Sequence, residues 1–276
     1  MKALSLTLGL AVAAMMAISC EPKQEPQKAL VLYYSQTSNT KVVAEEIASK
    51  LGADIEEIVL AEPYDGDFQA TIERCLKERE EGVVPEIQPI KADLSAYDVI
   101  FLGYPIWFGT YAPPVNAFLA QADLSGKKVV PFCTFGSGGL ESSVKDLAEK
   151  QPNAEILPGY GVRAARLEAV PAEVDRFLKA GGFIDGEYVA PDDFPEQHEA
   201  SEEEAAIFDA AVGDYSMIHA KAKTVAARAV PEGTEYLFTA EDLPREADGK
   251  LPPAGELKVY VLVAEGEAPV FTRVVR

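Results

Sequence analysis

Short apolar runs and amphipathic segments alternate along the first two thirds of the chain. Residues 29–34 (ALVLYY) form a continuous apolar run, as expected for a strand that is buried on both faces of a parallel sheet. Residues 40–51 place Val43, Ile47 and Leu51 at helical spacing, with charged residues between them. The chain therefore begins its folded part with a strand followed by a helix.

This alternation continues to about residue 180. It predicts strands at 29–34, 54–60, 97–103, 128–134 and 154–157, and helices at 40–51, 68–81, 112–122, 141–150 and 172–180. Strands that alternate with helices are typical of a doubly wound parallel sheet. We therefore expect residues 29–182 to form an α/β domain with a five-stranded parallel sheet. Its ligand site should lie at the carboxyl ends of the strands.

The pattern changes after residue 182. Residues 183–200 are acidic, contain prolines and lack periodicity, so we expect a linker. Ser201 and the three glutamates after it are typical of a helix start, and a solvated helix face explains the glutamates better than a metal site. A helix at 201–212 and strands at 220–230, 234–240, 257–264 and 269–275 predict an α+β domain at 201–276, with one helix on an antiparallel sheet.

The N-terminus has the layout of a secretory signal peptide at residues 1–19. Lys2 is followed by seventeen uncharged, mostly apolar residues, which is short for a transmembrane helix. The sequence Ala17-Ile18-Ser19-Cys20 resembles the lipobox of bacterial lipoproteins. This resemblance implies lipidation of Cys20 and a position outside the cytoplasm at the cell envelope. Residues 20–28, rich in proline and charge, would then form a tether.

Composition and charge narrow the range of functions. The 276 residues carry a net charge of −20, which argues against a nucleic-acid-binding protein. From Phe183 onward the chain has 8 basic and 20 acidic residues, so most of the acidity lies in the C-terminal part. Besides Cys20, only Cys75 and Cys133 carry thiols. We favour two buried, unpaired cysteines and keep a disulfide as the alternative.

The loop after the first strand contains Ser35, Gln36, Thr37, Ser38, Asn39 and Thr40. Hydroxyl and amide groups next to free backbone N–H groups at a helix N-terminus are suited to binding a phosphate. The loop lacks both the lysine of a nucleoside triphosphate loop and the GxGxxG pattern of dinucleotide-binding proteins. The alternative is that these residues only cap the helix and close a turn. All six residues carry a hydroxyl or an amide group, which exceeds what capping needs, so we favour a phosphate site.

The loops after the third and fourth strands complete the candidate site. The first of them contains the only tryptophan of the chain and a neighbouring phenylalanine, which suit contact with a flat conjugated ring. The second has three glycines in six residues, which allow close approach of a ligand or positive φ angles. Packing of the aromatic loop on its own helix is the alternative. The candidate residues are Pro105, Ile106, Trp107, Phe108 and Gly109 in one loop, and Thr134, Phe135, Gly136, Gly138 and Gly139 in the other.

These loops resemble those of the flavodoxin family, whose phosphate loop has the form [ST]-x-T-x-N-T directly after the first strand. Ser35, Thr37, Asn39 and Thr40 match this motif, while Ser38 replaces the common glycine. The resemblance covers about residues 28–182. It implies non-covalent FMN, with its phosphate on the first loop and its isoalloxazine ring between the other two. The acidic charge would then favour a low redox potential.

Three functional classes follow from this resemblance. The first is an electron carrier that exchanges electrons with a protein redox partner at the cell envelope. The second is an FMN-dependent reductase that acts on a small molecule such as a quinone and uses NAD(P)H. The third is a binding module that has lost its flavin. We find no convincing catalytic acid or base, because His198 and His219 lie outside the flavodoxin-like region.

A weaker resemblance concerns the C-terminal part. Residues 224–236 (TVAARAVPEGTEY) are distantly similar to the strand–turn–strand segment of cystatin-like domains, which often reads QVVAGxxY. The glutamine and the VAG turn of that segment are absent here. The resemblance therefore implies a fold only, and no inhibition of proteases.

Overall fold

The computed structural model describes residues 27–64, 68–213, 215–243 and 255–276. The predicted signal peptide at 1–19, the predicted lipidation site Cys20 and most of the predicted tether at 20–28 lie outside these residues. Within the described ranges, no helix combines the length and the apolar character needed to cross a membrane.

The first part of the chain alternates strands and helices, as predicted. Its elements are β1 (Ala29–Tyr33), α1 (Asn39–Leu51), β2 (Asp54–Glu57), α2 (Phe68–Glu81), a 3-10 helix (Leu94–Ala96), β3 (Val99–Trp107), β4 (Thr110–Tyr111), α3 (Pro113–Gln121), β5 (Lys128–Phe135), α4 (Leu140–Lys150), β6 (Glu155–Ile156), β7 (Tyr160–Arg163), a second 3-10 helix (Ala164–Ala169) and α5 (Val170–Ala180). The five predicted helices are all confirmed.

The strands form one sheet in the order β2-β1-β3-β5-β6, and neighbouring strands on this path are parallel. β6 pairs with the beginning of β5, whereas β7 pairs in parallel with its end. The predicted doubly wound parallel sheet is therefore confirmed. The winding direction switches between β1 and β3, and the loops after β1, β3 and β5 leave the sheet at the same edge.

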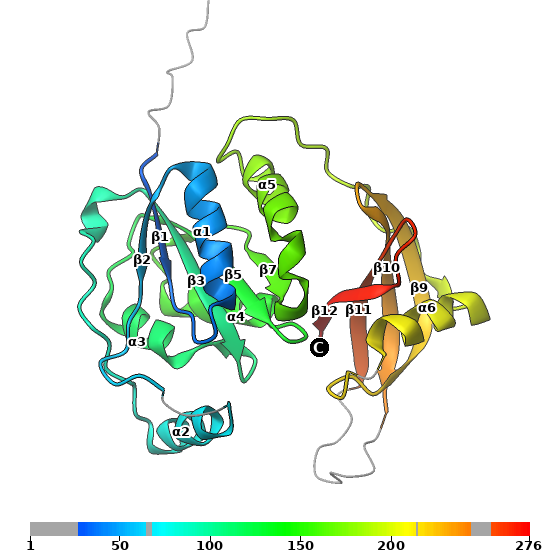
Figure 1. Cartoon of the computed structure of the whole chain (residues 1–276), viewed down its shortest axis with the longest axis horizontal. Coiled ribbons are helices and arrows are strands. Elements are labelled where there is room, and N and C mark those ends of the chain that lie inside the picture. Colours follow the sequence, from blue (N-terminus) through cyan, green and yellow to red (C-terminus); the bar gives the residue numbers. More distant parts are fainter. Residues whose placement is uncertain (1–26, 65–67, 214, 244–254) are drawn as a thin grey trace, which may run out of the picture.

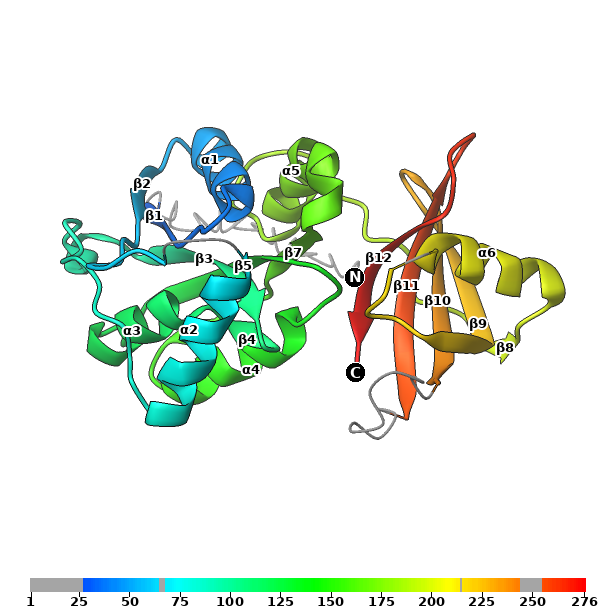
Figure 2. The same cartoon turned by 60° about the horizontal axis from the view of Figure 1, so that its bottom comes forward.

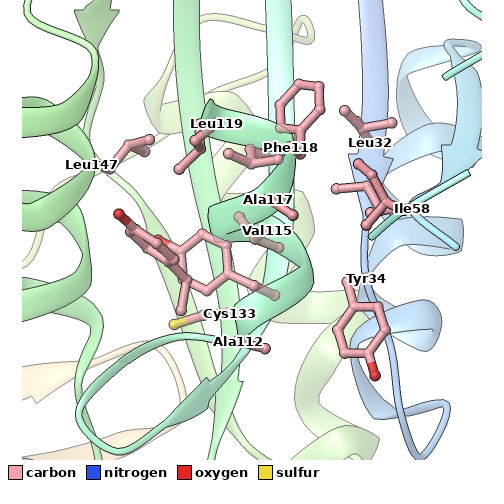
Figure 3. Close-up of a cluster of buried hydrophobic side chains, with 14 of the residues drawn as sticks. Leu32, Tyr34, Ile58, Ala112, Val115, Ala117, Phe118, Leu119, Cys133 and Leu147 are labelled. Carbon is pink, nitrogen blue, oxygen red and sulfur yellow. The ribbon is translucent and has the colours of Figure 1, made fainter. Parts of the chain in front are cut away.

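The central strands β1, β3 and β5 each support two cores, because their side chains alternate between the faces. On β1, Leu32 faces the core under α3 and α4, whereas the adjacent Val31 faces the core under α1 and α5. Figure 3 shows the first of these cores, where Phe118 of α3 lies beside Leu32 and Leu119 lies on the side of Leu147. The apolar run at 29–34 is thus buried on both sides, as its sequence predicted.

The C-terminal part forms a second sheet with one helix. Its elements are β8 (His198–Glu199), α6 (Glu202–Val212), β9 (Ala220–Val230), β10 (Gly233–Asp242), β11 (Glu256–Ala264) and β12 (Val270–Val275), and the strands run antiparallel in the order β12-β11-β10-β9-β8. α6 inserts Phe208 into the core of this sheet. Figures 1 and 2 show β12 as the strand nearest the parallel sheet. The predicted α+β architecture is confirmed, while the cystatin-like resemblance stays a prediction.

The start of α6 shows the predicted cap. The backbone N–H of Glu204 donates to the Ser201 hydroxyl at 3.3 Å, and the N–H of Ser201 donates to the Glu204 carboxylate at 3.0 Å. This reciprocal capping box explains why a serine precedes a run of glutamates, since it satisfies two N–H groups that the helix leaves free.

Three local predictions were wrong or incomplete. Residues 105–109, predicted as part of a loop, instead continue β3 to Trp107 and turn back into β4 as a hairpin. The sequence analysis missed β7, because the strand has only four residues and one of them is Gly161. The glycine is required by packing, since an added Cβ would lie 2.7 Å from the ring of Phe135. β8 lies in the predicted linker, where two residues pair with β9. Cys75 and Cys133 are buried and unpaired, as favoured.

Candidate functional site

The loop after β1 turns into α1 through a residue with an unusual backbone conformation. Ser38 occupies the N-cap position with φ 65° and makes no capping hydrogen bond with its side chain. Left-handed φ values favour glycine, which explains why the family motif commonly has glycine where this chain has Ser38. The capping role belongs instead to Ser35, whose hydroxyl accepts a hydrogen bond from the N–H of Lys41 at 3.3 Å.

The N-terminus of α1 offers several unused hydrogen-bond donors. Among the described residues, the backbone N–H groups of residues 37–40 have no acceptor, and the side chains of Thr37 and Ser38 are exposed. The first turn of α1 contains no acidic residue. Free N–H groups at the positive end of a helix dipole form an anion site. The chemistry of this donor set fits the phosphate that the sequence predicts.

Gln36 has a different role from its neighbours. Its side-chain oxygen accepts a hydrogen bond from the Tyr34 hydroxyl at 2.5 Å, and its nitrogen donates to the carbonyl of Tyr64 at 3.1 Å. The ring of Trp107 packs edge-on against both tyrosines, with centroids 6.0 Å and 5.6 Å apart. Burial raises the pKa of Tyr34 above its ordinary value, so this hydroxyl stays a hydrogen-bond donor. Gln36 and Trp107 therefore tie the first loop to the second.

The second loop is a β-hairpin with an exposed aromatic residue at its tip. Trp107 pairs with Thr110, which leaves Phe108 and Gly109 as a two-residue turn with φ values of 52° and 85°. A positive φ at a bulky residue is strained and clusters at functional sites. The Phe108 side chain is 46% exposed and lies 5.3 Å from the guanidinium of Arg79. Its ring is available to a planar ligand.

Thr110 in the same hairpin is a candidate that the sequence did not single out. Its hydroxyl oxygen is buried, yet it has no hydrogen-bond partner within the described part of the chain. Buried polar atoms normally have partners, so an orphaned one next to a candidate site fits a polar ligand. No sequence signal distinguishes Thr110, because its burial depends on the hairpin.

The third loop follows β5 and contacts both other loops. The hydroxyls of Thr40 and Thr134, both buried, lie 2.9 Å apart, which joins the start of α1 to the end of β5. A Cβ added to Gly139 would lie 2.6 Å from the side chain of Ile106 in the hairpin. The hydroxyl of Ser142, in the first turn of α4, donates to the carbonyl of Gly109 at 2.6 Å. The three predicted loops are therefore brought together at one edge of the sheet.

The glycines of the third loop have a use that the sequence did not reveal. A Cβ at Gly136 would lie 2.6 Å from the hydroxyl of Tyr215, and a Cβ at Gly138 would lie 2.0 Å from the carbonyl oxygen of Val274. Both contacts are with the C-terminal part of the chain. Phe135, the remaining candidate in this loop, is 4% exposed and packs in the core between α3, α4 and the sheet.

Comparisons with known proteins identify the family of the chain. The sequence model of the family Flavodoxin_4, described as flavodoxin, matches residues 28–171, which is more than half of the chain. A solved structure from Bacteroides eggerthii DSM 20697, described as a "putative flavoprotein", is 29% identical, with a TM-score of 0.50, and the match covers 56% of this chain and 97% of that one.

Two further structures have similar coverage. A protein from Bacteroides uniformis ATCC 8492, described in the same words, is 28% identical over 55% of this chain and 99% of its own, with a TM-score of 0.49. A flavoprotein from Lactobacillus acidophilus NCFM, in complex with FMN, is 27% identical, and the match covers 53% of this chain and 98% of that one, with a TM-score of 0.45. A search of curated proteins found no match. On the strength of the family match, the chain belongs to the flavodoxin family.

Proposed function

We propose that this protein binds FMN non-covalently and transfers electrons. The observation that carries the proposal is the N-terminus of α1, where the N–H groups of residues 37–40 have no acceptor among the described residues. This donor set follows β1 of a flavodoxin-family fold, at the point where the winding of the sheet switches. An anion site at this place fits the phosphate of FMN.

The residues of the three loops have separate tasks in this proposal. Residues 35–40 hold the phosphate, while residues 105–109 and 134–139 border the isoalloxazine ring. The bound flavin supplies the redox chemistry, and the protein supplies its orientation and surroundings. None of the three loops contains a histidine or a charged side chain. Electron transfer requires no acid–base group from the protein, so it is compatible with this composition of the loops.

Titration with FMN tests the proposal. Flavin-free protein is expected to quench the fluorescence of added FMN with a stoichiometry of one. Protein that stays colourless after incubation with excess FMN would contradict the proposal. Addition of NAD(P)H to the loaded protein under anaerobic conditions then separates the two redox roles. An electron carrier keeps its colour until a protein donor is added, whereas a reductase bleaches directly.

Phe108 offers a second test, because its replacement should change stability and affinity in opposite directions. Phe108→Asn creates Asn-Gly, the preferred pair for a turn with two positive φ values. Relief of the strain is expected to stabilise the flavin-free protein by up to about 1 kcal/mol. Loss of the ring is expected to weaken FMN binding about fivefold. Thermal unfolding and FMN titration measure the two effects, and a parallel loss of both would mean that Phe108 only supports the hairpin.

The cellular position is a further part of the proposal. The lipobox-like sequence before Cys20 supports lipidation of this cysteine and attachment of the protein to the outside of a bacterial membrane. The acidic charge supports a basic redox partner, since opposite charges speed the encounter of two proteins. Labelling of growing cells with radioactive palmitate tests the lipid, which should be absent from a Cys20→Ala variant.

A further inference from the structure

The C-terminal sheet docks directly on the third loop of the candidate flavin site. The backbone N–H of Val274 in β12 donates to the carbonyl of Ser137 at 2.7 Å. At the next residue, Gly138, the carbonyl of Val274 approaches so closely that any side chain would collide with it. The backbone of the edge strand β12 thus contacts residues 137 and 138 directly. The family match covers residues 28–171, so it includes Ser137 and Gly138 but not β12.

Arg163 at the end of β7 strengthens this contact. Its guanidinium donates to the carbonyl of Gly136 at 2.9 Å and to the carbonyl of Phe271 in β12 at 3.1 Å. It also lies 3.4 Å from the centre of the Phe271 ring and 5.2 Å from that of Tyr215. Arg163 is 9% exposed, so its charge is desolvated and these contacts are correspondingly strong. The residue links the third loop to the C-terminal sheet.

Tyr215 covers the third loop from the C-terminal side. Its ring packs against Phe271 with centroids 5.2 Å apart, and its hydroxyl lies over Gly136. Glu141 lies just after the loop, in the first turn of α4, and forms an ion pair with Arg273 of β12 at 3.6 Å. The contact therefore extends along the loop from residue 136 into α4.

The third loop transmits this contact to the rest of the site. Thr134 at its beginning joins Thr40 at the start of α1, and Gly139 at its end lies against Ile106 of the hairpin. A loop held on both sides in this way has little freedom to change its conformation. Its position depends on the C-terminal sheet as well as on the parallel sheet.

We propose that the C-terminal sheet is a positioning element of the FMN site, which holds residues 136–138 in the conformation that binds the isoalloxazine ring. Tyr215, Phe271 and Val274 act through the third loop and through Arg163. This inference rests on the proposed binding of FMN. It assigns a task to the part of the chain that the family match leaves out. Thermodynamic linkage adds a consequence, since a contact that strengthens FMN binding must itself be strengthened by FMN.

Tyr215→Ala tests the affinity side of the proposal in the full chain. Loss of the ring is expected to raise the Kd for FMN about five- to tenfold, in the range of couplings between separate sites. Tyr215→Phe keeps the ring over Arg163 and is expected to restore most of the affinity. The matched control is Glu232→Gln, which breaks the ion pair with Arg176. That pair also joins the two parts of the chain but contacts no residue of the third loop, so its loss is expected to leave the Kd within twofold of wild type.

Hydrogen exchange tests the linkage in the unaltered protein. FMN is expected to slow exchange in residues 270–276, which include the Val274 N–H, and to leave the central strand β10 unchanged. This measurement needs no variant, so it decides the matter even if Tyr215→Ala does not fold.

The outcomes separate this inference from the proposed function. Wild-type protein that binds no FMN overturns both. Wild-type protein that binds FMN, with the same Kd for Tyr215→Ala and no protection of residues 270–276, overturns the positioning role alone. An equal loss of affinity in Glu232→Gln would also contradict it, because general docking of the two parts would then explain the effect.

Discussion

Replacing Phe132 with alanine is expected to lower the free energy of unfolding by about 3–5 kcal/mol, the usual range for a fully buried aromatic residue. Phe132 is completely buried in β5 and lies over Gly103 of the neighbouring strand β3, its partner in the register. A Cβ at Gly103 would lie 2.1 Å from the Phe132 ring, so the ring fills the space that glycine leaves. Trp107, the only tryptophan, lies in this sheet and reports its unfolding by denaturant through fluorescence.

A double-mutant cycle shows whether the two residues form one packing unit. Gly103→Ala alone is expected to cost about 1–3 kcal/mol, because the added methyl group displaces the ring. In the Phe132→Ala protein the same methyl group enters vacated space, so its cost should nearly vanish. Costs that simply add would contradict a direct contact between the ring and Gly103. Ala117→Gly on α3 is a suitable reference, since it changes one buried methyl group elsewhere.

This contact matters to the site because of its place along the strands. Gly103 lies two residues before Pro105, and Phe132 lies two residues before Thr134, so both stand directly beneath the second and third loops. Gly103 has no side chain and Phe132 has a large ring, and together they determine how β3 and β5 pack on the helices. The distance between β3 and β5 therefore sets the distance between the second and third loops, which follow these strands. Core packing and cofactor binding are thus connected through the end of the sheet.

The elements of the fold followed closely from the sequence where apolar periodicity was strong. The helix at 68–81 and the strand at 220–230 have the predicted bounds. The order of strands and helices predicted the sheet, and the sheet placed the three loops at one edge. Local apolar patterns and the geometry of parallel strands are enough to predict these elements and their order.

Local patterns could not predict features that depend on distant contacts. The turn at Phe108 and Gly109 places a bulky residue where asparagine or glycine is preferred, so propensity argued against a hairpin. The three glycines after β5 were attributed to a ligand or to positive φ angles, yet Gly136 and Gly138 face Tyr215 and Val274. Contacts between residues so far apart in the chain leave no signature in either segment. The exceptions to local rules nevertheless cluster at the candidate site, as expected when function overrides local preference.

Replacing Thr37 or Asn39 with alanine is expected to weaken FMN binding about 10- to 100-fold for each residue. A hydrogen bond to a charged group contributes about 1.5–3 kcal/mol, and each 1.4 kcal/mol is a factor of ten in the Kd. Among the described residues neither side chain has a hydrogen-bond partner, and Thr37 is exposed. Stability of the flavin-free protein should therefore change little, which separates a loss of ligand contacts from a loss of structure.

Conservative and charged replacements sharpen this test. Thr37→Ser keeps the hydroxyl and should retain most of the affinity, whereas Ser35→Ala removes the group that caps α1 and should destabilise the protein as well. Asn39→Asp is the strictest variant. A carboxylate in the first turn of α1 should stabilise the helix through its dipole and repel the phosphate, so unfolding shifts to higher temperature while FMN affinity falls below that of Asn39→Ala. Unchanged affinity in Asn39→Asp would place the phosphate elsewhere, because no anion binds beside a new negative charge without cost.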